Sequence, residues 1–312
     1  MSYSSRRTSR KPRGFSLEGG SPGTVLRFLL PALIFVFAVL LFPAGYSLYA
    51  SFFNWPLNDA SAREFIALGN YARLFTDPEF WNSLKLQAGF IVIALPIELA
   101  LGFAAALLLN REFPGAGVVR TLLLLPVFML PVLSGFTWRY MLQPDYGPIN
   151  WIVAALGGKQ VLWLNDPTLA YVAVIVQDVW RMWPFMFMLL YAGLTTIPEE
   201  LFEAAFMDGA SWGHRLRRII LPMLRPTVIT ALLLRLIDAL RIFSEVYTMT
   251  EGGPGSSTLL FSLYTHRQAF SFFRVGLASA MAIFLLVLSV AVAMLIVRKN
   301  MRLEEMSKGA DA

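Results

Sequence analysis

The residues best suited to chemistry in this chain are ionisable side chains that interrupt long apolar segments. Arg235, Asp238, Arg241 and Glu245 lie in one such segment. At 100° per residue, their directions on a helix fall within an arc of about 120°. The sequence therefore predicts a helix with one polar face. An ionisable group at the centre of a membrane helix costs roughly 2.5 to 3.5 kcal/mol, so this face should line a cavity or meet other charges.

A second polar set is expected on another apolar segment. Its members fall within an arc of about 100°, and they are Gln177, Asp178 and Arg181, with Trp180 and Trp183 beside them. Glu98 interrupts a third apolar segment near its middle. These side chains and the first polar face are the candidate cavity residues of the chain.

Two interpretations of the candidate cavity residues stay open. In the first, carboxylates and guanidiniums bind the hydroxyls of a solute while aromatic rings stack on a sugar. In the second, the charges form ion pairs that hold helices together. Asp178 with Arg181 and Arg235 with Asp238 are spaced i,i+3, so each pair could neutralise itself. Glu98 could pair with either arginine.

Several familiar reaction sites are missing from the sequence. There is no cysteine, and the two histidines, His214 and His266, are far apart, so thiolate chemistry and a histidine-rich metal site are not expected. Gly158-Lys159 is followed by Gln160, so no phosphate-binding Gly-Lys-Ser/Thr loop is present. We expect no cofactor in this chain and no catalytic residue. Energy for any transport must come from a partner.

The most informative polar segment runs from Thr195 to Trp212. Thr196 with Glu199 has the spacing of a capping box, which predicts a short helix beginning there. Gly209 predicts a left-handed stop, and Ser211 predicts the cap of a second short helix that ends ahead of Pro222. Composition alone leaves two roles open, an interfacial linker lying on lipid headgroups or a surface that docks on another protein.

The elements that must position these residues are membrane helices. Of the 312 residues, 57% are apolar and only 15% are charged, against about 25% in soluble domains. Crossing a bilayer takes roughly 20 apolar residues of helix. Six stretches qualify, namely residues 27–51, 85–109, 121–142, 169–193, 224–248 and 275–297. The predicted fold is an all-α polytopic membrane protein with a helical cytoplasmic loop, 196–222, between its fourth and fifth spans.

Orientation follows from Lys and Arg in the connections between spans. If the N-terminus is cytoplasmic, the inside segments hold 14 of these residues and the outside segments hold 5. Both termini should therefore be cytoplasmic. Residues 1–23 are expected to be a disordered basic tail attracted to anionic lipid, residues 24–298 the membrane domain, and residues 299–312 a second cytoplasmic tail. The basic residues lie between apolar segments and do not form a soluble patch, so nucleic acid is not an expected partner.

The 196–222 loop resembles the signature loop of binding-protein-dependent ABC importer permeases. The matching residues are Glu203, Ala204 and Ala205, then Asp208, Gly209 and Ala210, then Leu221 and Pro222. Other parts are similar to the carbohydrate, maltose-type branch of these permeases. They are Gly69-Asn70-Tyr71, Asp77-Pro78, Gly147-Pro148-Ile149-Asn150, Trp163-Leu164 and Thr250-Glu251-Gly252-Gly253-Pro254.

This resemblance implies a place in a larger assembly. The chain would be a permease that pairs with a second, homologous permease in a bacterial or archaeal cytoplasmic membrane. Two ATPase subunits, which bind ATP and magnesium, would dock beneath it, and an external solute-binding protein would deliver a sugar. Glu203, Ala204, Ala205, Asp208 and Gly209 would lie in or beside the coupling helix that contacts the ATPase.

Two other classes of function stay open on the residues alone. One is an ion-coupled secondary transporter acting alone, with Glu98, Asp178 and Asp238 as proton or sodium sites. The other is a membrane-embedded enzyme that acts on lipid-linked substrates. Neither class accounts for the pattern between Glu203 and Pro222.

Overall fold

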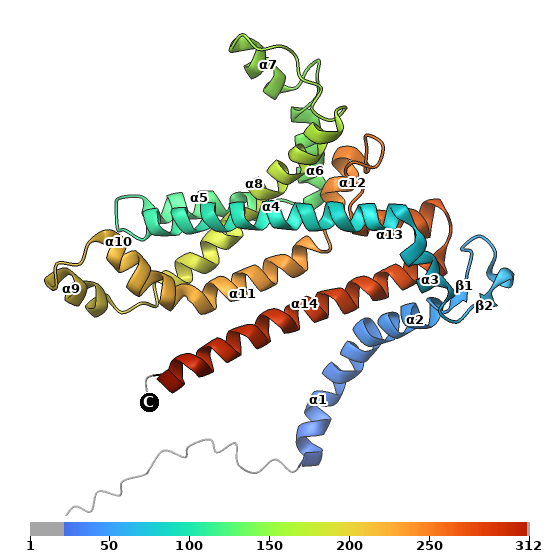
Figure 1. The fold of residues 1–312 in the computed structure, drawn as a ribbon, viewed down its shortest axis with the longest axis horizontal. Coiled ribbons are helices and arrows are strands. Elements are labelled where there is room, and N and C mark those ends of the chain that lie inside the picture. Colours follow the sequence, from blue (N-terminus) through green and yellow to red (C-terminus); the bar gives the residue numbers. More distant parts are fainter. Residues whose placement is uncertain (1–21, 311–312) are drawn as a thin grey trace, which may run out of the picture. The chain divides into compact units, whose positions relative to one another are not determined.

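A computed structural model describes residues 22–310 of the chain, which are mostly helical (Figure 1). The expected basic tail, 1–23, lies outside the described residues except for its last two positions. The helical elements are α1 (Pro22–Val36), η1 (Phe37–Leu41), α2 (Phe42–Ala50), η2 (Ala60–Ala62), α3 (Gly69–Thr76), α4 (Pro78–Leu109), α5 (Ala116–Phe128), α6 (Pro131–Met141), α7 (Pro148–Ala155), α8 (Pro167–Leu194), α9 (Glu199–Met207), α10 (Trp212–Arg215), η3 (Leu216–Ile220), α11 (Leu221–Ala239), α12 (Ser244–Thr250), α13 (Phe261–His266), η4 (Arg267–Ser271) and α14 (Val275–Ala310).

Within the described residues, five helices are long and apolar enough to cross a membrane, and a bent pair makes up to six spans. The five are Leu29–Ala50, Pro78–Leu109, Pro167–Leu194, Trp212–Ala239 and Val275–Arg298. These spans coincide with the expected apolar stretches, so the predicted polytopic helical fold is confirmed. The chain divides into two units, Met1–Tyr49 and Ala50–Ala312.

The third expected span is not one straight helix. Its two halves, α5 and α6, meet at 92°. Met129 and Leu130 between them have extended backbone, with ψ values of 130° and 133°. Pro131 explains the break, because a proline disfavours helical geometry in the residue before it and has no N–H to donate.

The fifth expected span is also interrupted, which corrects the prediction of one polar helical face. Helix α11 ends at Ala239, and the short helix α12 begins only at Ser244. Phe243 before it has φ −142° and ψ −58°, outside helical geometry. Arg241 therefore lies in the break and Glu245 on a different helix from Arg235, so a continuous helical wheel does not describe their directions.

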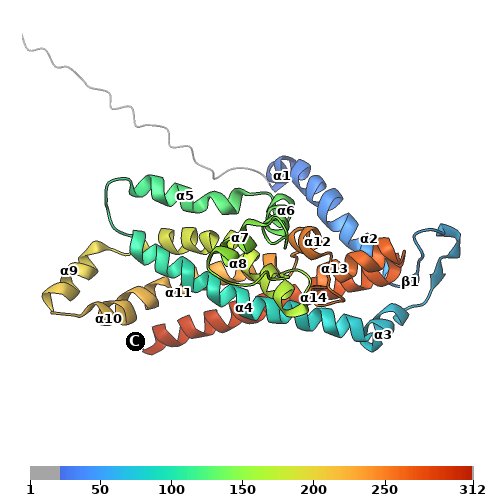
Figure 2. The same ribbon diagram turned by 90° about the horizontal axis from the view of Figure 1, so that it is seen from above.

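Helices α4 and α8 form the centre of the second unit and lie against each other over much of their length (Figure 2). Gly102 allows this close approach. A Cβ atom added at Gly102 would lie 2.6 Å from Cβ of Met186 and 2.7 Å from the backbone nitrogen of Phe187. Small residues at such crossings are typical of membrane helix pairs, whose association depends on close packing.

The connection between α2 and α4 forms a small folded cap. Strands β1 (Phe53–Asn54) and β2 (Glu64–Phe65) pair antiparallel. The buried Asn70 of α3 donates from Nδ2 to the carbonyls of Ser51 and Phe53, both at 2.8 Å. A short segment is thereby fixed at one end of the spans.

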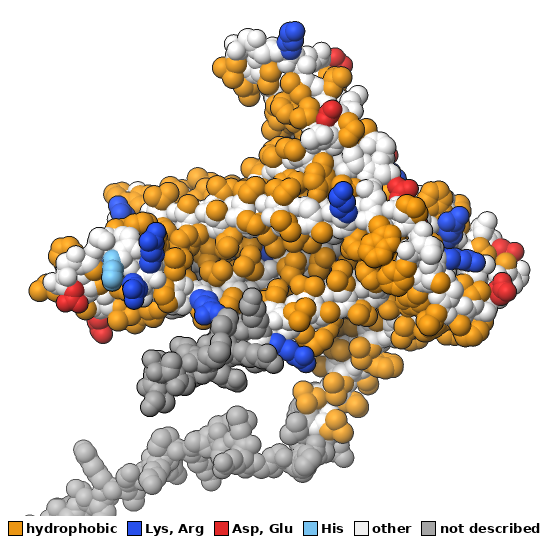
Figure 3. All heavy atoms as spheres, viewed as in Figure 1, with side chains coloured by type: hydrophobic (Ala, Val, Ile, Leu, Met, Phe, Trp, Pro, Cys, Tyr) orange, Lys and Arg blue, Asp and Glu red, His pale blue; other side chains and the backbone are white. Residues whose placement is uncertain are grey.

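The surface of the second unit matches an apolar environment along the spans. Hydrophobic side chains cover most of the face in Figure 3, and charged ones gather near α9 and α10 and near the strands. Leu108, Val92 and Phe128 are between 71% and 77% exposed on helices that cross the membrane. Such side chains need lipid or another membrane subunit around them, because water would disfavour so large an apolar surface.

Candidate functional site

The loop between α8 and α11 begins with helix α9, whose first turn carries Glu199 and Glu200. Carboxylates in this position are favoured by the helix dipole. The predicted capping box is wrong, however. The hydroxyl of Thr196 donates to the carbonyl of Gly193 at 2.7 Å, and Pro198 takes the N-cap position without a side-chain bond. The last turn of α8 uses the hydroxyl that the sequence pattern assigns to α9.

The end of α9 follows the prediction. Gly209 has φ +71°, in the left-handed region. The N–H of Ala210 donates to the carbonyl of Ala205 at 2.9 Å, and that of Gly209 donates to Phe206 at 3.0 Å. A left-handed glycine followed by a bond that reaches back five residues is the Schellman arrangement, which ends a helix sharply.

The turn presents a tip that the second unit does not cover. Phe206 is 72% exposed and Met207 is 84% exposed, while Glu203, Ala204 and Asp208 are also exposed. We call residues Glu203–Gly209 the knob. The base of the loop is anchored instead, because Ile197 and Ile220 belong to a buried apolar cluster. The knob is therefore a projecting surface on a fixed base.

The second short helix of the loop begins as predicted but does not end. Ser211 accepts a hydrogen bond from the N–H of His214 at 3.4 Å, so it caps α10. The helix then continues through the π turn η3 into α11, and residues Trp212–Ala239 form one span. The predicted stop before Pro222 is wrong. A proline in the first turn of a helix, or behind a widened turn, costs little because it lacks only one N–H.

The buried charges meet at Arg235, which is fully buried on α11. Its Nε and Nη2 atoms donate to the two carboxylate oxygens of Glu98 at 2.8 and 3.0 Å. Nη2 also contacts Asp178, and Nη1 donates to Asp238 at 3.1 Å. We call these four residues the Arg235 cluster. It joins α4, α8 and α11, which confirms the predicted Arg235–Asp238 pair and the pairing of Glu98 with an arginine.

A second buried ion pair lies next to the cluster. Arg181 donates to Glu245 at 2.7 Å and links α8 to α12. The predicted Arg181–Asp178 pair is therefore wrong, because each side chain faces a different neighbouring helix. Gln177 donates to the hydroxyl of Ser134 at 2.8 Å, which ties α8 to α6. The predicted polar set on α8 is real, but its members bind three different elements.

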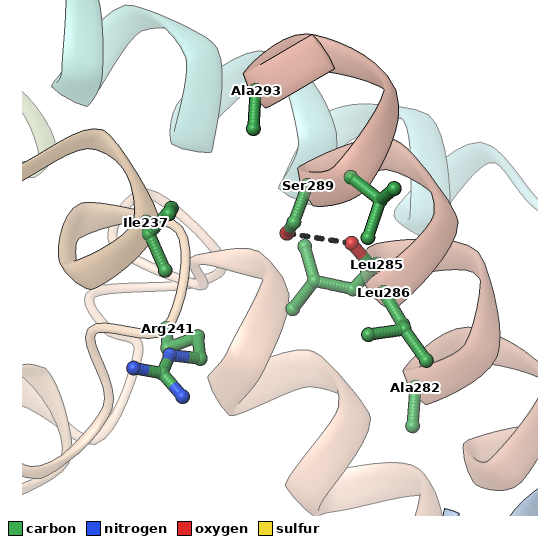
Figure 4. A pocket seen from close by; sticks show the side chains of 8 residues that line it. Ile237, Arg241, Ala282, Leu285, Leu286, Ser289 and Ala293 are labelled. Atoms are coloured by element: carbon green, nitrogen blue, oxygen red, sulfur yellow. Dashed lines mark hydrogen bonds between the residues drawn. The ribbon is translucent and has the colours of Figure 1, made fainter. Parts of the chain in front are cut away.

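Arg241 stands apart from these contacts. It lies in the break after α11 and is exposed, like Asp238. Figure 4 shows it with Ile237 beside a groove whose other side is α14. The groove encloses about 390 Å³, and Ser289 on its far side donates to the carbonyl of Leu285 at 2.7 Å. Of the candidate cavity residues, Asp238 and Arg241 are the two that the second unit leaves open.

The sequence of the chain matches a known family of membrane proteins. Residues 30–302 match the model of the family described as "Binding-protein-dependent transport system inner membrane component". The chain belongs to this family of transport-system permeases. It is therefore a multi-pass membrane component of a transport system and not an enzyme, as the resemblance of the knob and the membrane spans had implied.

The permease has relatives at substantial identity. It is 39% identical over 266 residues to the trehalose/maltose transport system permease protein MalF of Thermococcus litoralis, covering 84% of this chain and 88% of the relative. It is 35% identical over 276 residues to the sulfoquinovosyl glycerol transport system permease protein SmoG of Agrobacterium fabrum, covering 88% and 90%.

A solved structure supports the fold of the permease. A chain of a bacterial alginate ABC transporter, crystallised with an alginate pentasaccharide-bound periplasmic protein, superposes with a TM-score of 0.79 at 22% identity. The alignment covers 89% of the permease and 94% of that chain. At this identity the likeness concerns the fold alone.

Several motif residues of the permease prove to have structural contacts. Asn150 donates to the carbonyl of Val161 at 2.9 Å and accepts from the indole Nε1 of Trp163 at 3.1 Å. Asp77 caps α4 by accepting from the N–H of Glu79 at 2.9 Å, and it also accepts from the hydroxyl of Tyr264. Burial of the Tyr264 hydroxyl and its hydrogen bond to the Asp77 carboxylate raise the pKa of Tyr264. These motifs therefore hold the loops between the spans in place.

His266 and Arg120 make contacts that the local sequence does not indicate. His266 is half-buried, and its ring centroid lies 4.9 Å from that of Phe243 and 4.8 Å from that of Phe270. The guanidinium of Arg120 binds two carbonyls and lies over a tyrosine ring. No local pattern distinguishes Arg120, because its partners come from other elements.

Proposed function

We propose that this permease is a subunit of an ATP-driven ABC importer that brings a sugar or sugar-like solute into the cell. The relatives named for trehalose, maltose and sulfoquinovosyl glycerol support a carbohydrate cargo. A second, homologous permease completes the channel, and an external solute-binding protein delivers the cargo. The permease itself carries no cofactor, since ATP and magnesium bind to two partner ATPase subunits.

The observation that carries this proposal is the geometry of the knob. A helix that ends in a left-handed glycine projects Phe206 and Met207 away from the protein, while Ile197 and Ile220 hold its base. Exposed apolar side chains beside oriented carboxylates favour a protein partner over water. The knob is the coupling helix, and Glu203, Ala204, Ala205, Asp208 and Gly209 are its contact residues.

The mechanism is alternating access. ATP binding closes the two ATPases and draws the two knobs of the permease pair together, which turns the channel from inward-facing to outward-facing. Hydrolysis restores the inward-facing state. Both termini of the permease and its knob lie on the cytoplasmic side, in agreement with the excess of basic residues there.

The candidate cavity residues divide into two groups in this mechanism. Glu98, Asp178 and Arg235 bind one another and are fully buried, as Arg181 and Glu245 largely are, so they hold helices together. Asp238 and Arg241 are exposed beside the α11 break and are the side chains that a solute can reach. Replacing Arg241 with Gln should change solute affinity and leave assembly intact.

Co-purification tests the proposal directly. The permease is extracted in mild detergent from its native host, its partners are identified and ATP hydrolysis is measured. We expect an ATPase and a second permease with the wild-type chain, and loss of the ATPase with Gly209→Asp. The matched control is Gly213→Asp, which adds the same charge to α10 at a site with open space around it.

The same experiment can contradict the proposal. A chain that purifies alone or as a homodimer, with no ATPase, overturns it. Ion-driven uptake in liposomes by the chain alone would then favour a secondary transporter. Glu98 and Asp178 both contact the guanidinium of Arg235, so a coupling ion in that alternative would have to share these carboxylates with it.

A further inference from the structure

Arg120, at the base of the loop that carries the knob, joins three segments of the permease. Its Nε and Nη2 atoms donate to the carbonyl of Leu109 at 3.2 and 2.7 Å, and Nη2 also donates to the carbonyl of Arg111 at 3.1 Å. Leu109 is the last residue of α4, and the final carbonyls of a helix have no partner within it. Arg120 on α5 therefore caps α4.

The same guanidinium reaches α8. Its central carbon lies 4.7 Å from the ring centroid of Tyr191, within the range of a cation–π contact. Tyr191 also accepts the N–H of Thr195 through its carbonyl at 3.1 Å, so it belongs to the turn that ends α8. The chain passes from this turn directly into α9. One side chain thus connects α4 and α5 to the segment that supports the knob.

A hollow beside these contacts leaves room for movement. It encloses about 580 Å³ between the α4–α5 connection and the start of α9, and Arg120, Tyr191, Glu199 and Phe202 line it. Figure 2 places α5 and α9 at the same end of the second unit. Leu109 of α4 and Leu124 of α5 pack against the buried apolar cluster that holds Ile197 and Ile220. At the hollow this packing is open, so a directional contact can add to it. Arg120 supplies such a contact, because it binds carbonyls at the end of α4 and lies over the ring of Tyr191 on α8.

We propose that Arg120 is a positioning residue that makes α4 and α5 move together with the base of the knob when the ATPase displaces it. This inference rests on the proposed function, because it needs an ATPase on the knob. The role depends on the Arg120 guanidinium, which is planar and carries several N–H donors. A guanidinium can bind two carbonyls and lie flat on a ring at once, which an ammonium cannot do.

Spin-label distances in the assembled transporter test this role. The permease contains no cysteine, so labels at Val118→Cys on α5 and Glu200→Cys on α9 are specific within it when the partner subunits are cysteine-free. Both positions are exposed. Distances are measured in nanodiscs without nucleotide and with ATP plus vanadate. We expect the same narrow distribution in both states, because α5 follows α9.

Variants at Arg120 separate its contacts from its charge. Arg120→Gln should broaden or shift the distances in one nucleotide state, and it should lower stimulation of ATP hydrolysis by the solute-binding protein about five-fold or more, as expected for a lost coupling. Arg120→Lys should give distances and stimulation of ATP hydrolysis between those of the wild type and those of Arg120→Gln. Arg111→Gln is the matched control, since it removes a charge from the same hollow and leaves the Arg111 carbonyl in place. It should behave as the wild type.

Each outcome decides the inference. Arg120→Gln that assembles with wild-type distances and stimulation overturns it, while the ATPase interaction of the proposed function would stand. If Arg120→Gln does not assemble, Arg120→Lys and Tyr191→Leu decide: altered distances in either support the role, and wild-type distances in both overturn it. A wild-type permease that purifies without an ATPase overturns the proposed function and this inference with it.

Discussion

The Arg235 cluster buries charged side chains, whereas the knob exposes apolar ones. In the cluster, a guanidinium buried among membrane helices meets carboxylates from two other helices as well as its own. In the knob, apolar Phe206 and Met207 stay exposed at the end of a well-formed helix. The charged side chains of the cluster bind one another, whereas the apolar side chains at the tip of the knob stay exposed among the described residues. Buried side chains that bind one another contribute to folding, whereas an exposed apolar surface indicates a partner.

The largest expected effect comes from breaking the cluster. Arg235→Met removes the common partner of Glu98 and Asp178, and leaving buried charges unpaired costs about 3 to 5 kcal/mol. We expect a large loss of folded protein and of thermal stability in detergent. Arg241→Met is the matched control, because Arg241 is exposed outside the cluster. Equal stability of the two variants would contradict the structural role of the cluster.

The next effect concerns the knob and should appear in binding. Phe206→Asp places a charge on a side chain that is 72% exposed in the free permease. Its stability should change by less than about 0.5 kcal/mol. ATPase affinity should fall by at least about thirty-fold, the loss of roughly 2 kcal/mol that marks an interface hot spot. Thermal unfolding of the isolated permease and titration of the ATPase give the two values. A stability loss without a binding loss would make the knob a folding element.

A smaller effect should follow from the turn itself. Gly209→Ala forces a Cβ atom into a left-handed residue, which costs about 1 to 2 kcal/mol. Gly209→Asn is the control, because asparagine tolerates this conformation and the site has open space around it. We expect several-fold weaker ATPase binding for Ala than for Asn in the same titration. Similar affinities for both would show that the partner does not need this turn.

The smallest effect tests the start of α9. Since the Thr196 hydroxyl binds the carbonyl of Gly193, Thr196→Val should change stability by less than about 0.5 kcal/mol. Ser211→Ala removes an actual helix cap and should cost about 0.5 to 1 kcal/mol, as its hydrogen bond is long. Thermal unfolding of both variants compares them. A larger loss of stability for Thr196→Val than for Ser211→Ala would support the predicted capping box.

The sequence alone determined the features that depend on local chemistry. Apolar segments of about 20 residues indicate membrane helices, because a helix satisfies its own backbone hydrogen bonds in lipid. A glycine four residues after Glu203-Ala204-Ala205 ended α9 as predicted, since its left-handed conformation depends on the residue itself. The resemblance of this loop identified the family for the same reason, because its residues are close together in the chain.

Only the tertiary structure decided which groups meet. Arg235 binds Glu98 across 137 positions of sequence. Arg181 binds Glu245 on another helix and not Asp178, which is only three positions away on its own helix. A helical wheel could not place Arg241, because the chain breaks at the end of α11. Arg120 likewise gains its role from carbonyls and a ring on other helices. Ion pairs and caps depend on distances in space, which packing sets and residue types leave open.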